Sequence, residues 1–119
     1  MIETGEGVDD ISTSGVTTFA ELAKGKVTTG LIDPRWLNIP AAPLDELRGG
    51  DAVENAGYLE GILSGKIQGA KRDLTLVNAA GGFVVAGLCN DMNEGLSRAR
   101  EQIDSGRALE KLRALQQFA

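Results

Sequence analysis

The chain has 119 residues, enough for one domain with a modest hydrophobic core. Hydrophobic residues make up 42% and charged residues 24%, a composition typical of globular proteins and not of disordered ones. A formal net charge of -5 argues against nucleic acid or an anionic membrane as a partner. The sequence contains no histidine, which excludes Ser-His and Cys-His catalysis and the usual zinc sites.

A single cysteine, Cys89, excludes an intramolecular disulfide bond, and we expect it to be a small buried residue. Residues 1–6 have neither a basic stretch nor an apolar run, so they do not resemble a signal peptide. The longest apolar run, residues 74–88, is interrupted by polar and glycine residues and is too short to cross a bilayer. These features predict a protein of the reducing cytoplasm, without a membrane segment.

The first half of the chain predicts a β-hairpin. Residues 17–22 and 26–32 are rich in β-branched side chains and flank the short turn Ala23-Lys24-Gly25, where glycine permits a positive φ. Residues 33–43 contain all three prolines, which lack backbone donors, and are expected to form a connecting loop.

The second half of the chain predicts about four helices. Asp51 with Glu54, and Asp91 with Glu94, resemble capping boxes, and serine-glycine pairs at 64–65 and 105–106 are typical helix stops. A last helix follows the second stop. The side chains expected to face inward are Ala52, Ala56, Leu59, Leu63, Met92, Leu96, Ala99, Ile103, Leu109, Leu112, Leu115 and Phe118.

Residues 73–87 are ambiguous when they are interpreted locally. β-Branched residues on both sides of Gly81-Gly82 favour a second hairpin, because each glycine inside a helix costs about 1 kcal/mol relative to alanine. A fully buried helix would also be apolar on all sides, and Asn78 would then need an internal hydrogen-bond partner. The residues alone leave both alternatives open.

The polar loop at residues 5–15 holds the main candidate for a functional site. Two adjacent carboxylates, Asp9 and Asp10, lie there among glycines and hydroxyls, and like charges side by side repel each other. A hard divalent cation such as Mg²⁺ relieves this repulsion and often bridges protein carboxylates to substrate phosphates. An Asp-Asp pair in a polar loop is nevertheless more often simply solvated.

Two further segments could attract an anion. Arg48-Gly49-Gly50-Asp51 opens a helix, and glycine-rich helix starts can cradle phosphate. The Asp51 carboxylate occupies the place where an anion would lie, so we interpret this segment as a tight turn and helix cap. Lys71-Arg72 is interpreted as a solvated helix start.

Four segments in this order resemble the anthranilate phosphoribosyltransferases. They are VDDIST at 8–13, LDELRGGDAVENA at 44–56, DLTLVNAAGGFVVAGL at 73–88 and EGLSRAREQIDSGRALEKLRAL at 94–115. That family belongs to the nucleoside phosphorylase-like phosphoribosyltransferases, whose subunits pair a small helical domain with a larger α/β domain. The chain resembles roughly the last third, all of it in the larger domain.

The resemblance implies an α/β fold in which residues 1–119 form a single partial domain. Residues 1–43 would be the loop and hairpin region with the acidic pair, residues 44–119 the helical region, and residues 73–87 a helix. Asp9 and Asp10 correspond to the pair that binds the Mg²⁺ accompanying phosphoribosyl pyrophosphate (PRPP). The sequence departs from the usual family pattern in three places: Asp10 replaces glutamate, Glu3-Thr4-Gly5 replaces a His-Gly pair, and Gly81-Gly82 replaces alanines.

The resemblance also implies transfer of the phosphoribosyl group from PRPP to anthranilate in tryptophan biosynthesis. In the family, the loops that hold pyrophosphate and the anthranilate pocket lie upstream, so we expect the isolated chain to be inactive without the missing N-terminal part. A complementary chain or self-association would then supply partners. The alternatives are a non-catalytic docking domain, a decayed fragment, or a sister phosphoribosyltransferase or phosphorylase of the same superfamily.

Overall fold

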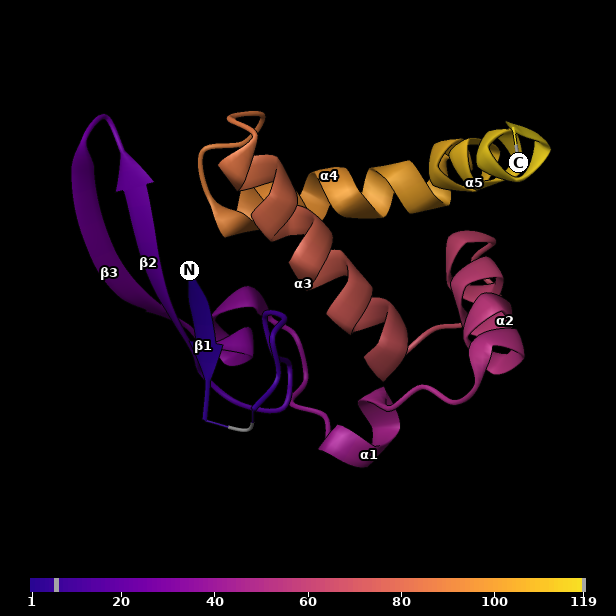
Figure 1. Ribbon diagram of the computed structural model, residues 1–119, viewed down its shortest axis with the longest axis horizontal. Coiled ribbons are helices and arrows are strands. Elements are labelled where there is room, and N and C mark those ends of the chain that lie inside the picture. Colours follow the sequence, from indigo (N-terminus) through magenta and orange to yellow (C-terminus); the bar gives the residue numbers. More distant parts are fainter. Residues whose placement is uncertain (6, 119) are drawn as a thin grey trace.

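The protein is described here by a computed structural model of residues 1–5 and 7–118. Within these residues a three-stranded antiparallel sheet is followed by helices (Figure 1), which confirms the predicted α/β class and hairpin. The sheet has the order β1-β2-β3. The elements are β1 (Ile2–Thr4), β2 (Thr17–Ala23), β3 (Lys26–Ile32), the 3-10 helix η1 (Pro34–Leu37), α1 (Leu44–Leu47), α2 (Ala52–Leu63), α3 (Ala70–Val85), α4 (Met92–Asp104) and α5 (Arg107–Phe118).

The hairpin of β2 and β3 turns where the sequence predicts it. Lys24 and Gly25 have φ values of 51° and 76°, and two successive positive φ angles are what a tight type I′ turn requires. Ala23 pairs with Lys26 across this turn. Further along, the Phe19 ring lies over Gly30, where a Cβ would stand 2.7 Å from the ring. The glycine therefore makes room for the aromatic side chain.

The segment at 33–43, expected to be a plain loop, contains one turn of 3-10 helix. The Asp33 carboxylate starts η1 by accepting hydrogen bonds from the backbone N–H of Arg35 at 2.9 Å and from its guanidinium Nη2 at 2.6 Å. Pro34 takes the first helical position, where a missing N–H is tolerated, and Asn38 ends the turn at a φ of 56°.

Of the two predicted capping boxes, the one at Asp51 forms in full and the one at Asp91 forms in part. The Asp51 carboxylate accepts from the Glu54 N–H, and the Glu54 side chain accepts from the Asp51 N–H, each at 2.9 Å. Asp91 likewise accepts from the Glu94 N–H at 2.8 Å, but the Glu94 carboxylate reaches back one residue further, to the Asn90 N–H. Both helices end at the expected serine-glycine pairs.

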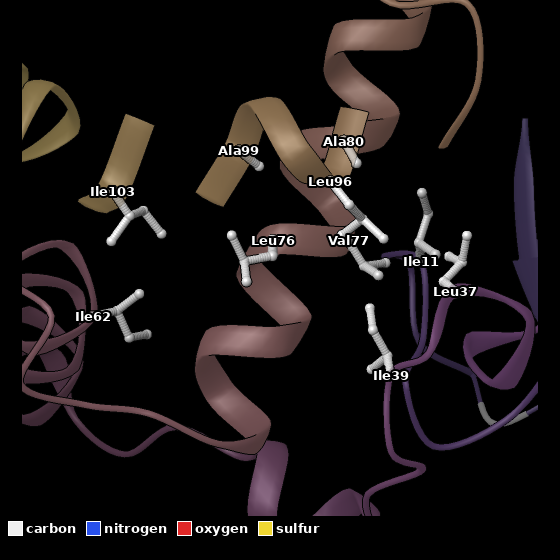
Figure 2. Packing of buried hydrophobic residues seen from close by; sticks show 10 residues of the cluster. All are labelled: Ile11, Leu37, Ile39, Ile62, Leu76, Val77, Ala80, Leu96, Ala99 and Ile103. Atoms are coloured by element: carbon white, nitrogen blue, oxygen red, sulfur yellow. The ribbon is translucent and has the colours of Figure 1, made fainter. Parts of the chain in front are cut away.

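Residues 73–87, for which local propensity favours a hairpin, lie mostly within the helix α3. This helix runs through the middle of the molecule (Figure 1), so its apolar face is covered on more than one side. Figure 2 shows the core around it, formed by Ile11, Leu37, Ile39, Ile62, Leu76, Val77, Ala80, Leu96, Ala99 and Ile103. Burial of the central residues of α3 outweighs their weak helix propensity.

The predicted inward faces are right for α4 and partly wrong for α2 and α5. Leu96, Ala99 and Ile103 are buried, whereas Leu115 and Phe118 are 65% and 89% exposed. In α2 the predicted Ala52, Ala56 and Leu59 are exposed, and Gly61 and Ile62 are buried instead. The reason is position: α2 and α5 lie at the outer end of the molecule (Figure 1), where the described part of the chain covers them on one side only.

Two smaller expectations have different outcomes. Cys89 is buried, as expected for a small core residue. The Lys71-Arg72 pair is not a solvated helix start, because Arg72 is buried and its Nη2 donates to the Asp104 carboxylate at 3.0 Å. Lys71 donates to the Glu46 carbonyl at 2.7 Å. Among the described residues, no helix is long and apolar enough to cross a bilayer.

Candidate functional site

Asp9 and Asp10 lie in the loop between β1 and β2, and both are exposed. Glu6, in the same loop, lies outside the described residues. Within the described part of the chain, no three His, Cys, Asp or Glu side chains gather in one place. The candidate site therefore offers two adjacent carboxylates, a donor set that fits Mg²⁺, since this ion usually keeps several waters and takes one or two protein carboxylates plus phosphate oxygens.

The loop is anchored immediately before the acidic pair. Thr4, which is buried at the end of β1, donates its hydroxyl to the Val8 carbonyl at 2.9 Å and accepts from the Val8 N–H at 3.0 Å. Between them, Gly7 has a φ of 72°, a conformation that favours glycine. The Thr4 side chain thus fixes both backbone groups of the residue that precedes Asp9.

The loop is anchored again immediately after the acidic pair. Asn78, from the middle of α3, accepts from the Ile11 N–H at 2.8 Å and donates to the Ile11 carbonyl at 2.9 Å. It also donates to the Leu74 carbonyl of its own helix at 3.0 Å. These bonds provide the internal partner that a helical Asn78 needs, and they connect positions 67 residues apart.

The Ile11 side chain joins the same anchor to the core. Ile11 is 3% exposed and lies with Val77 and Ala80 in the cluster of Figure 2. A Cβ at Gly81 would stand 2.7 Å from the Ile11 Cδ1 methyl group. The absence of a side chain at Gly81, where related sequences are expected to carry alanine, therefore makes room for Ile11.

Residues 12 and 13, which follow Ile11 in the loop, are buried and bonded to their surroundings. The Ser12 N–H donates to the hydroxyl of Thr17 at 3.0 Å, and the Thr13 carbonyl accepts from the Ala42 N–H at 3.1 Å. Ser12, Thr13 and Thr17 are at most 1% exposed. The exposed carboxylates therefore project from a segment that is held on both sides. The sequence pointed to Asp9 and Asp10 but not to Thr4 as an anchor, although the Thr4–Val8 contact spans only four residues.

The glycine-rich turn before α2 is occupied by its own side chains. Asn55 accepts from the Gly50 N–H at 2.9 Å and donates to the Gly50 carbonyl at 3.1 Å. A Cβ at Gly50 would stand 1.9 Å from the Glu54 carboxylate, so glycine leaves room for that side chain in the capping box. The backbone donors at 50 and 51 are thus already paired, which supports a turn and helix cap over a phosphate cradle.

A separate groove of about 730 Å³ lies along α3, α4 and α5. Its lining is largely apolar and includes Leu76, Phe83, Ile103 and Ala108. Neither Asp9 nor Asp10 lines it. The groove and the acidic pair are therefore two different features of the surface.

The sequence of the chain is similar to sequences of known proteins. Residues 1–109 match the family described as "Glycosyl transferase family, a/b domain". The chain is 47% identical over 113 residues to the anthranilate phosphoribosyltransferase of Desulfatibacillum aliphaticivorans, covering 95% of this chain and 33% of that protein. It thus spans about a third of the length of the curated relatives it matches.

Solved structures show the same similarity. The anthranilate phosphoribosyltransferase of Thermus thermophilus superposes with a TM-score of 0.82 at 33% identity, over 92% of this chain and 32% of that one. The enzyme from Saccharomyces cerevisiae in complex with PRPP and Mg superposes with a TM-score of 0.84 at 26% identity, over 94% of this chain and 32% of that one.

Proposed function

The chain belongs to the glycosyl transferase family, a/b domain, and we propose that Asp9 and Asp10 hold Mg²⁺ together with PRPP as part of an anthranilate phosphoribosyltransferase. The observation that carries this proposal is the acidic loop: two adjacent exposed carboxylates lie between Val8 and Ile11, and both flanking residues are held by side-chain hydrogen bonds. The resemblance of the whole chain to anthranilate phosphoribosyltransferases, one of them in complex with PRPP and Mg, supports the choice of ligand.

The two carboxylates would bind Mg²⁺ and orient the PRPP that accompanies it. Because Val8 and Ile11 are anchored, the loop loses little conformational freedom when a ligand arrives, and that preorganisation favours binding. Bound Mg²⁺ would supply stabilisation of negative charge on the pyrophosphate that leaves. No protein nucleophile is required for this role, which agrees with a chain that contains no histidine.

The whole reaction we propose is transfer of the phosphoribosyl group from PRPP to the amine of anthranilate, with release of pyrophosphate, in tryptophan biosynthesis. The chain corresponds to about a third of its relatives, and a metal-binding loop alone does not position both substrates. We therefore expect the purified chain to show no turnover. Added in trans, the preceding two thirds of the Desulfatibacillum relative should restore some activity if the parts associate.

The acidic pair is tested by substitution in an active assembly. Asp9→Asn or Asp10→Asn should lower kcat/KM by a large factor, since weakening coordination of such an ion removes several kcal/mol of stabilisation, on the order expected for metal catalysis. The free energy of unfolding should change by about 0.5 kcal/mol at most, as for other exposed substitutions. Asp45→Asn, which changes another exposed carboxylate, on α1, is the matched control. Wild-type kcat/KM and Mg²⁺ dependence in both loop variants would refute the metal assignment.

A second candidate function is that of a non-catalytic domain that docks onto another chain. The observation that favours it is an exposed apolar face on the hairpin, where Leu22, Val27 and Leu31 are 72%, 63% and 52% exposed. Association that survives loss of both acidic side chains, without turnover in any assembly, would select this alternative.

A further inference from the structure

We propose that Asn78 is a positioning residue for the acidic pair. Its side-chain amide comes from α3, in the core of the molecule, and holds the backbone at Ile11, directly after Asp10. This inference rests on the proposed function, because it concerns how the same loop presents Asp9 and Asp10 to a cation.

The backbone N–H that Asn78 holds belongs to a rigid peptide unit that includes Asp10. The N–H that donates to the Asn78 Oδ1 at 2.8 Å belongs to the peptide unit joining Asp10 to Ile11. A peptide unit is planar, so holding its N–H also restricts where the Asp10 carbonyl and Cα, which lie in the same plane, can be. The bond at 2.9 Å from the Asn78 Nδ2 to the Ile11 carbonyl then fixes the next peptide plane.

The orientation of the Asn78 amide is itself determined. Its nitrogen faces two carbonyl acceptors, those of Ile11 and Leu74, and its oxygen faces one N–H donor. Turning the amide over would place its oxygen against these two carbonyl oxygens and its nitrogen against the Ile11 N–H, and no hydrogen bond could form in either place. The side chain therefore has one satisfied arrangement, and it is set by the helix.

Another asparagine in the same chain provides a matched reference. Asn55 makes the same two-way contact with a backbone, accepting from the Gly50 N–H at 2.9 Å and donating to the Gly50 carbonyl at 3.1 Å. That contact shapes the turn before α2 and has no part in the acidic loop. Loss of either amide removes hydrogen bonds of the same kind, but only Asn78 contacts the residue after Asp10.

The experiment is a titration of the 119-residue chain with Mn²⁺, followed by the broadening of backbone amide NMR signals at residues 8–11. Asn78→Ala keeps the helix, because alanine is the best helix former, and it should weaken Mn²⁺ binding roughly tenfold or more, as loss of outer-shell partners of metal sites does. Asn78→Ser should weaken Mn²⁺ binding by a similar factor. If the alanine variant does not fold, the serine variant provides the test of the positioning role. Faster hydrogen exchange at the Ile11 amide should accompany the loss.

The controls separate this inference from the proposed function. Asn55→Ala should bind Mn²⁺ like the wild type, whereas Asp9→Asn and Asp10→Asn should bind weakly. Wild-type affinity in folded Asn78 variants, or an equal loss in Asn55→Ala, would overturn the positioning role alone. A wild-type chain that binds no Mn²⁺, or binds it equally without the two carboxylates, would overturn the acidic-pair assignment and this inference with it.

Discussion

Gly95 of α4 lies directly against Ala80 of α3. A Cβ at position 95 would stand 2.8 Å from the Ala80 carbonyl oxygen and 2.9 Å from its Cα. Ala80 is fully buried, and two of the three atoms nearest that Cβ belong to its backbone, so neither helix can yield by a simple side-chain rotation. Glycine at this position therefore sets how closely α3 and α4 pack.

This contact predicts that Gly95→Ala destabilises the protein. Alanine gains helix propensity of about 1 kcal/mol, but forcing a methyl group into a filled contact between helices typically costs about 1–3 kcal/mol and shifts the backbone. We expect a net loss in the free energy of unfolding, measured by urea denaturation followed by circular dichroism. An unchanged or raised midpoint would show that the helices separate freely here.

Gly82→Ala should have the opposite effect. Gly82 is exposed in the last turn of α3, and a Cβ there would meet no atom within 4 Å. Replacement should raise the free energy of unfolding by about 0.5–1 kcal/mol through helix propensity alone. Gly81→Ala is the matched comparison, because its methyl group would press on Ile11. Its free energy of unfolding should rise less than that of Gly82→Ala, or fall. Equal gains at both positions would contradict the described packing of Ile11.

The ion pair at the start of η1 predicts an acid-sensitive contribution to stability. Hydrogen bonds from the Arg35 side chain, and then from its backbone N–H, hold the pKa of Asp33 below its usual 3.8. Since the folded-state pKa is the lower one, this stabilisation is fully present above pH 3.8 and is lost as the pH falls through the folded pKa. Asn is also a good helix cap, so Asp33→Asn removes mainly the charge. Its melting temperature should lie below that of the wild type at pH 7, and the difference should shrink in acid.

The exposed face of the hairpin predicts self-association of the isolated chain. Leu22 pairs with Val27 across the hairpin, and Leu31 lies on the same face four residues along β3. Exposed apolar side chains gathered on a sheet surface favour association. Sedimentation velocity should detect oligomers that Leu22→Lys reduces and that Thr28→Lys, on the opposite face, leaves in place. A monomer at high concentration would contradict this expectation.

Asp10→Glu should be tolerated or beneficial in an active assembly. It lengthens the second carboxylate by one methylene, to the residue that the resemblance identifies as usual, and it keeps the charge. The kcat/KM and the Mg²⁺ concentration for half-maximal rate would be measured beside those of Asp10→Asn. A glutamate variant as impaired as the asparagine variant would show that the loop has adapted to the shorter side chain.

Several features that depend on neighbours a few residues away follow from the amino-acid sequence alone. The turn at Lys24 and Gly25 follows from glycine's tolerance of positive φ, and the helix starts at Asp51 and Asp91 follow from side chains that reach the backbone three residues on. Such contacts form within one turn of chain, so local patterns suffice to predict them. The choice of Asp9 and Asp10 as candidate ligands likewise came from the sequence.

Features that depend on distant partners emerge only when the chain is folded. Local propensity favours strands around Gly81, yet α3 is a helix, because its central residues are buried and Asn78 bonds to Ile11, 67 residues away in the sequence. Leu115 and Phe118 continue an apolar stripe but remain exposed, since no described element covers the outer side of α5. A periodic pattern states which face of a helix is apolar. Only the arrangement of the other elements states whether anything packs against that face.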